Sequence, residues 1–145
     1  MFKKLILTIA VTAMIHGFAF ADEYTHDSTI LPQAARDVIY NNFKAEISVI
    51  KIDKDFGHIS EYEVVLTDGS EIQFDSKGNW KDVEAARDKS VPDAFLPSAI
   101  TEYVSIHQKG AKVVGIERKR YGYEVELSNG IEMKFDKNGK FLRYD

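Results

Sequence analysis

The stretch Tyr62–Trp80 reads YEVVLTDGSEIQFDSKGNW, and the stretch Tyr123–Phe141 reads YEVELSNGIEMKFDKNGKF. The two stretches align without a gap and share nine identical residues, among them both glycines of each. Upstream, Leu31-Pro32-Gln33-Ala34 corresponds to Leu96-Pro97-Ser98-Ala99. Similarity at a fixed spacing indicates a duplicated structural unit, so the repeat predicts the architecture before any single residue is considered.

Each unit is expected to begin with a helix. Pro32 and Pro97 suit a first helical turn, where the missing N–H would have no partner in any case. Behind each proline, apolar residues recur at helical spacing: they are Ala34, Ala35, Val38, Ile39 and Phe43 in the first unit, and Ala99, Ile100, Tyr103 and Val104 in the second. Four alternating segments follow each helix, which is typical of strands with one buried face.

The register of the second and third strands follows from the apolar pattern. A two-residue loop at the Asp-Gly or Asn-Gly pair would put the apolar side chains on opposite faces of the sheet. A three-residue loop, Thr67–Gly69, pairs Val64 with Ile72 and turns every apolar side chain toward the helix. The corresponding loop in the second unit is Ser128–Gly130. We therefore predict a positive φ at the glycine that ends each loop.

The fold class predicted from these patterns is α+β, with two tandem α-β4 repeats, each a helix packed on one face of a four-stranded antiparallel meander. The first repeat covers residues 30–84 and the second covers residues 92–145, with a mostly polar linker at residues 85–91. Residues 22–29 are expected to be a mobile arm without core residues. Residues 1–21 are expected to be a signal peptide.

The signal peptide is predicted from three features in order. Lys3 and Lys4 precede an apolar run that is too short to span a membrane comfortably, and Ala19-Phe20-Ala21 provides a cleavage site. The mature chain would then start at Asp22, in the periplasm or outside the cell, with no membrane span. The alternative is an uncleaved N-terminal anchor helix.

Composition restricts the partners. The formal net charge is −4, and removal of Lys3 and Lys4 with the leader makes it more negative by two. An acidic domain is a poor match for nucleic acid, so no nucleic-acid partner is expected. The chain has no cysteine, so an exported domain of this size must be stabilised by its core alone.

The pattern LP-x-A followed by Y-E-V-x-L-x-(D/N)-G-x-E-x-x-F-D-x-x-G-x-(W/F), present twice, resembles the PepSY-like family of secreted bacterial proteins. That family is grouped with the fold of the β-lactamase inhibitor protein. The resemblance implies two α-β4 units whose sheets join into one curved sheet, and a role in binding or inhibiting other proteins. The inhibitor's contact loops do not match this chain, so no contact residue is transferred.

Signatures of catalysis are lacking in the sequence. His26, His58 and His107 are scattered and have no second ligand at metal spacing. No nucleophile elbow, phosphate-binding loop or dinucleotide fingerprint occurs. We therefore expect neither an enzyme nor a bound cofactor or metal.

The open face of the sheet is predicted to be acidic. Residues that alternate with the core set include Glu63, Glu124 and Glu126, and these are candidate contacts for a basic peptide or protein. The alternative is that the charges only keep the surface soluble.

Two loops between the first and second strands form the other candidate site. The first is three residues longer than the second and carries Phe56 and His58, whereas the second carries Tyr121. Aromatic residues on loops of a rigid sheet are frequent binding anchors, although Phe56 and Tyr121 could instead fold back on the core. The leading hypothesis is a non-catalytic binding or inhibitory module for a protein or peptide. The alternative is a periplasmic small-ligand-binding or envelope-stress protein.

Overall fold

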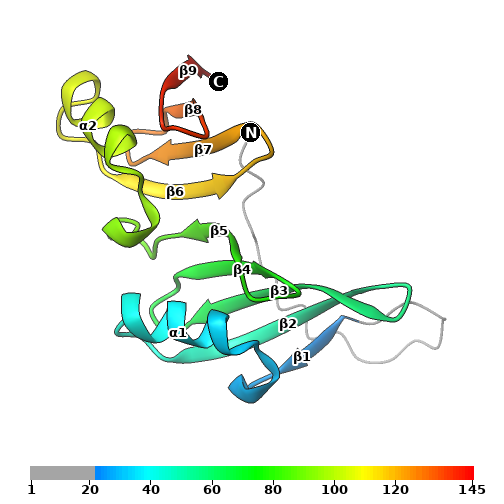
Figure 1. Ribbon diagram of the computed structural model, residues 1–145. Helices are drawn as coiled ribbons and strands as arrows, with labels where there is room; N and C mark the ends of the chain where they lie inside the picture. The colour runs from blue at the N-terminus through cyan, green and yellow to red at the C-terminus, as the bar shows by residue number, and fades with distance from the viewer. Residues whose placement is uncertain (1–21) are drawn as a thin grey trace, which may run out of the picture.

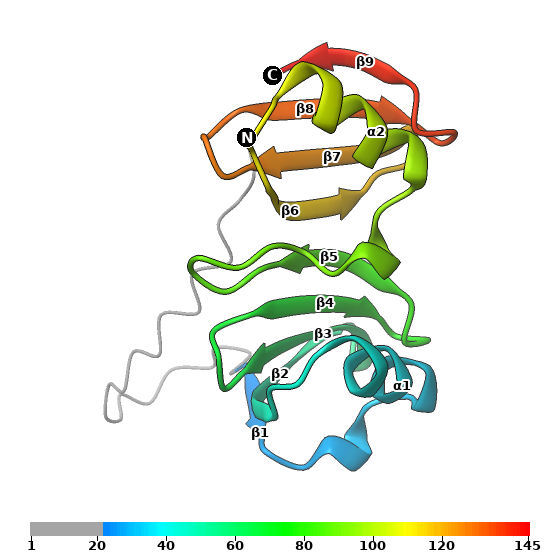
Figure 2. The ribbon, with the colours of Figure 1, turned by 90° about the vertical axis from the view of Figure 1, so that its left-hand side faces the viewer.

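In the computed structural model, residues 22–145 are described and form an α+β structure with one nine-stranded antiparallel sheet (Figure 1). The strands lie side by side in sequence order from β1 to β9, and both helices cover the same face of the sheet (Figure 2). The helices are α1 (Gln33–Asn42) and α2 (Ser98–His107). The strands are β1 (Glu23–Thr25), β2 (Ile47–Asp55), β3 (His58–Leu66), β4 (Glu71–Asp75), β5 (Trp80–Glu84), β6 (Val113–Arg118), β7 (Gly122–Leu127), β8 (Glu132–Asp136) and β9 (Phe141–Tyr144).

Residues 22–29 differ from the expected mobile arm, because they contain strand β1. This strand pairs with β2, so that Thr25 lies opposite Ile50. After it, Asp27 caps a short 3-10 helix, Ser28–Ile30, by accepting a hydrogen bond from the Thr29 amide at 2.9 Å. The segment is held by backbone pairing and capping, which a search for apolar residues does not detect. The predicted signal peptide, residues 1–21, lies outside the described residues.

The predicted hairpin register is confirmed in both halves of the chain. Val64 lies opposite Ile72 in the β3–β4 pair, and Val125 lies opposite Met133 in the β7–β8 pair. The glycines that end the two loops, at positions 69 and 130, have φ values of 92° and 82°. Alternation of apolar and polar residues was therefore sufficient to choose between the two- and three-residue loops.

Strand β5 contains a bulge that controls which residues reach the open face. Trp80 lies opposite Phe74, but Asp82 lies opposite Gln73, so the intervening Lys81 is the extra residue. Because of this bulge, Trp80 and Val83 both point into the core, and Asp82 points to the face without helices.

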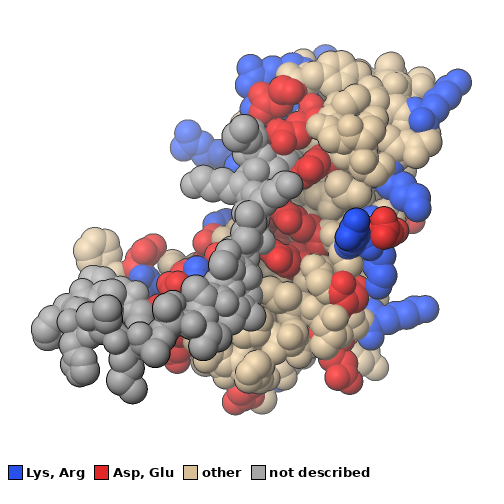
Figure 3. Space-filling view, turned by 180° about the vertical axis from the view of Figure 1, so that it is seen from behind, with Lys and Arg blue, Asp and Glu red and all other residues tan. Residues whose placement is uncertain are grey.

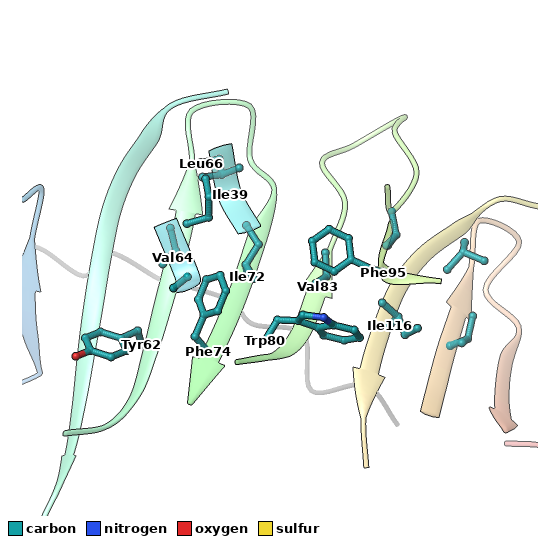
Figure 4. Close-up of a cluster of buried hydrophobic side chains, with 14 of the residues drawn as sticks. Ile39, Tyr62, Val64, Leu66, Ile72, Phe74, Trp80, Val83, Phe95 and Ile116 are labelled. Atoms are coloured by element: carbon teal, nitrogen blue, oxygen red, sulfur yellow. The ribbon is translucent and has the colours of Figure 1, made fainter. Parts of the chain in front are cut away.

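A continuous core connects the two ends of the sheet (Figure 4). Val83 of β5 lies opposite Ile116 of β6, where the two halves of the sheet meet. Phe95, from the short 3-10 helix Asp93–Phe95, stacks edge-on against Trp80 at 5.4 Å between ring centroids. The guanidinium of Arg118 lies 3.7 Å from the centre of the same Trp80 ring. The helix side of the sheet is therefore occupied by the core, and the opposite face carries no helix.

Candidate binding site

Two rows of side chains cross the open face of the sheet. The first row runs through directly paired positions from β2 to β9: Lys51, Glu63, Gln73, Asp82, Glu117, Glu124, Lys134 and Arg143. The second runs from β3 to β8: Val65, Glu71, Glu84, Gly115, Glu126 and Glu132. The predicted residues Glu63, Glu124 and Glu126 thus lie on one surface. Figure 3 shows Asp and Glu side chains gathered on the side of the molecule away from the helices.

Lysines partly neutralise both ends of the first row. Lys51 Nζ lies 3.1 Å from a carboxylate oxygen of Asp53 and 3.6 Å from one of Glu63. Lys134 Nζ lies 3.6 Å from a carboxylate oxygen of Glu124 and 2.9 Å from one of Asp145. Burial raises the pKa of Glu63, although the nearby Lys51 charge opposes the change. Two of the predicted acidic residues are therefore already in ion pairs.

Asp82 is the most unusual group on this face. Only 5% of its surface is exposed, and no hydrogen-bond partner for its Oδ1 atom is found among residues 22–145. Burial, followed by the negative charges of Glu117 and Glu84, raises the pKa of Asp82 to about 8; the Lys119 charge acts in the opposite direction. Lys119 Nζ instead donates to Glu117 at 2.5 Å.

Glu71 on β4 is in a related position. Burial and the charges of Glu84 and Glu63 raise the pKa of Glu71 to about 7. In the described part of the chain its Oε2 atom is buried and accepts no hydrogen bond. Where the second row reaches β6 it meets Gly115, which has no side chain to fill the space between Glu84 and Glu126. The centre of the face therefore combines several neighbouring carboxyl groups with a position, Gly115, that has no side chain.

The sequence did not single out this centre. Asp82 and Glu84 were missed because strict alternation from Trp80 puts Asp82 on the core side of β5. The signal that could have found them is Val83, because a core position for both Trp80 and Val83 requires an extra residue between them.

Phe56 lies at the tip of the β2–β3 hairpin, which extends beyond the neighbouring strands (Figure 1). Its side chain is fully exposed, and its φ is +49°, a backbone region that favours Asn or Gly. Gly57 follows with φ +80°, so the two residues form a tight turn of the type for which Asn-Gly is the usual sequence. His58, the second predicted residue of this loop, is exposed beside the turn and lies opposite Asp55 in the pairing of β2 with β3. The alternative that Phe56 folds back on the core is therefore wrong.

Tyr121 is arranged differently from Phe56. Its hydroxyl donates a hydrogen bond to Glu124 Oε1 at 2.5 Å, and 41% of its surface is exposed. Burial and this hydrogen bond raise the pKa of Tyr121. Tyr121 is therefore exposed like Phe56, but its hydrogen bond to Glu124 joins the loop to the acidic row.

The chemistry available on this face is that of carboxylates, which accept hydrogen bonds and attract cations. Residues 22–145 contain no group of three or more His, Asp or Glu side chains placed to hold a metal ion. The histidines are separate: His26 Nδ1 lies 2.5 Å from the Ser48 carbonyl oxygen, and the His107 ring stacks on Tyr103. Within the same residues, no helix is long and apolar enough to cross a membrane.

Comparison with known proteins gives a consistent result. Residues 60–143 match the family described as "Putative beta-lactamase-inhibitor-like, PepSY-like". A "putative periplasmic protein of unknown function" from Bacteroides vulgatus ATCC 8482 is 43% identical, with a TM-score of 0.80; the match covers 86% of this chain and 99% of that one. A "putative calcium-regulated periplasmic protein" from Bacteroides thetaiotaomicron is 38% identical, with a TM-score of 0.78, over 86% and 96% of the two chains.

A third solved structure, a "putative periplasmic protein from DUF2874 family", also comes from Bacteroides vulgatus ATCC 8482. It is 35% identical, with a TM-score of 0.77, and the match covers 88% of this chain and 98% of that one. Among curated proteins, none matches this sequence.

Proposed function

The chain belongs to the PepSY-like family, and from this premise we propose that it is an exported, non-catalytic module that binds or inhibits another protein. The partner would contact the open face of the sheet and the tip of the β2–β3 hairpin. The periplasmic descriptions of the solved relatives support export, and the predicted cleavage after Ala21 completes this proposal. Intact-mass measurement of the exported protein tests it, because a retained Met1 would contradict leader removal.

The architecture that we propose for this role is a tandem duplication of an α-β4 unit. It is supported by the sequence repeat and by the order of elements, since α1 precedes four strands and α2 precedes four more. Duplication of this kind gives one long sheet with both helices on the same side, so that a broad opposite face stays open to a partner.

The proposal rests on the full exposure of the Phe56 side chain and on the positive φ of its backbone. A fully exposed Phe adds nothing to the core, and a positive φ at a residue with a β-carbon costs stability. A sequence selected only for folding would prefer Asn at this position. A large aromatic residue that projects from a rigid hairpin is instead suited to fill a pocket on a partner.

The acidic face supplies the second part of the proposed interface. Excess negative charge on an open surface accelerates encounter with a basic partner, and it contributes more to the rate and to specificity than to affinity. Tyr121 and Glu124 lie on this face and are joined by their hydrogen bond. We propose that Phe56 anchors the partner and that the carboxylates, including Glu63, Glu124 and Glu126, orient it.

A small-ligand role is the second candidate, and one observation favours it. One solved relative is described as calcium-regulated, and carboxylate oxygens are the ligands that calcium prefers. Calcium is therefore tested as a ligand, through its effect on thermal unfolding, in the experiment that follows.

The proposal is tested by capture from periplasmic extract with the mature protein as bait, in parallel with four variants. Phe56→Ala removes the proposed anchor and Glu126→Lys reverses a charge on the open face. Their matched controls are Tyr40→Ala and Glu102→Lys, which change an exposed aromatic residue of α1 and an exposed acid of α2 on the opposite side.

The expected result is one stoichiometric protein that is retained by both controls and lost or strongly reduced with Phe56→Ala and Glu126→Lys. Equal retention by all four variants would contradict the proposed surface. If wild type captures no protein, and thermal unfolding shifts only on addition of calcium or a small metabolite, the second candidate function is favoured.

A further inference from the structure

We propose that the carboxylates around Asp82 form a subsite for one lysine or arginine side chain of the partner, and that occupation of this subsite expels protons, so that binding strengthens as pH rises. This inference depends on the proposed function in one respect: the subsite lies on the proposed binding face. It assigns a ligand group and a pH dependence to Asp82, which sequence analysis did not select.

The geometry places a buried acceptor at the centre of the face. Asp82 is 5% exposed, and its Oδ1 atom has no hydrogen-bond partner in the chain from residue 22 onward. A buried carboxylate oxygen without a donor is unfavourable, because the desolvation of the group is not compensated. A donor supplied by a partner would remove this cost.

The groups that face Asp82 are mostly acidic. Glu71 approaches from β4, Glu84 lies on the same strand, and Glu117 lies directly opposite on β6. Lys119, whose charge opposes the rise in the pKa of Asp82, donates instead to Glu117. The uncharged Gln73, which lies opposite Asp82 on β4, donates its side-chain amide to Glu61 at 2.8 Å.

The two lysines of the first row are engaged at its ends. Lys51 contacts Asp53 and Glu63, and Lys134 contacts Glu124 and Asp145. Neither is paired with Asp82 or Glu71 among the ion pairs of the described residues. Gly115, which lies opposite both Glu84 and Glu126, contributes no side chain to this face. The centre of the row can therefore receive a positive charge from outside.

A long cationic side chain fits this site better than a metal ion. The described residues hold no group of three or more acidic or histidine ligands placed around one point. A guanidinium or ammonium carries several donors on a flexible stem, and it can reach a recessed carboxylate while its apolar stem packs beside it. The expected ligand is therefore a basic side chain, and the experiment below would detect calcium if calcium bound instead.

The pH dependence follows from linkage. With pKa values raised to about 8 and about 7 by burial and by neighbouring acids, Asp82 and Glu71 hold protons near neutral pH. A bound cation favours the ionised carboxylate and lowers both pKa values, so binding releases protons. Affinity should therefore increase between pH 6 and pH 8.5.

The test uses capped hexalysine as the probe and the mature protein at low ionic strength. Binding is measured from pH 6 to pH 8.5, and the number of protons released is obtained by calorimetry in buffers with different ionisation enthalpies. The variants are Asp82→Asn and Glu71→Gln at the subsite, and Glu102→Gln on the exposed side of α2 as the matched control.

Wild type and the control should bind about tenfold more tightly at pH 8.5 than at pH 6 and should release protons. Asp82→Asn should bind at least fivefold more weakly at pH 8.5, with most of the pH dependence lost, and Glu71→Gln should show a smaller loss. The proposal is overturned if hexalysine does not bind, if Asp82→Asn retains the wild-type pH dependence, or if calcium chloride binds stoichiometrically and displaces the probe. Any of these results would overturn the subsite alone. The proposed function is tested separately, by the capture experiment with Phe56→Ala.

Discussion

Replacement of Asp82 by Asn should stabilise the folded protein, and the gain should grow with pH. Asn keeps the size of the side chain and removes the charge that burial and the neighbouring acids disfavour. Because the pKa of Asp82 is raised from 3.8 to about 8, the folded state binds more protons than the unfolded state between these values. The free energy of unfolding of wild type therefore falls as pH rises through this range.

The magnitude follows from the same shift. At pH 7 the folded protein must keep Asp82 protonated about three pH units above its ordinary pKa, at about 1.4 kcal/mol for each unit. The cost of keeping Asp82 protonated is then roughly 4 kcal/mol of unfolding free energy. This is an upper limit, because Glu117 and Glu84 can turn toward water and reduce the repulsion. We expect Asp82→Asn to gain between about 1 and 4 kcal/mol at pH 7, and almost nothing at pH 4.

Urea unfolding at pH 4, 5.5, 7 and 8.5, followed through the fluorescence of the single buried tryptophan, Trp80, measures this difference. Glu102→Gln, an exposed acid on α2, serves as the control and should change little at any pH. A loss of stability in Asp82→Asn at pH 7, or a gain of the same size at pH 4 and pH 8.5, would refute the electrostatic explanation.

Three further predictions concern the fold and the hairpin tip. Gly69→Ala and Gly130→Ala should each lower the free energy of unfolding by about 1 kcal/mol or more, because both positions have positive φ; unchanged thermal melts would count against the loop geometry. Phe74→Ala and Phe135→Ala should each cost about 3–5 kcal/mol in urea unfolding, since both rings are completely buried. Phe56→Asn should raise stability by up to about 1 kcal/mol through relief of the positive φ, and it should reduce partner capture; a clear loss of stability would show that the Phe56 ring packs on the protein.

Much of the fold could be predicted because period-two alternation leaves little freedom of register. In the β3–β4 hairpin, a one-residue shift would have moved Val64 and Ile72 to different faces, so the pattern alone selected the loop. The polar members of the same alternation gave Glu63, Glu124 and Glu126 their correct places on the open face.

The parts that could not be predicted depend on local irregularities and on single contacts. The bulge at Lys81 reverses the side on which Asp82 lies, and strict alternation cannot foresee it. Strand β1 is short and polar, and it is held by backbone pairing that leaves no apolar signal. The different positions of Phe56 and Tyr121 depend on a strained turn and on a hydrogen bond to Glu124, which appear only once the strands are placed.

The central claim is that a partner protein docks at the hairpin tip and the open face. It is tested most directly by placing a photoreactive phenylalanine analogue at position 56 of the exported protein, with the same analogue at position 40 of α1 as the control. Irradiation of intact cells should give one dominant cross-linked protein from position 56, and Glu126→Lys in the same chain should reduce its yield. The absence of any cross-linked protein from position 56, or the same set of products from both positions, would contradict the claim.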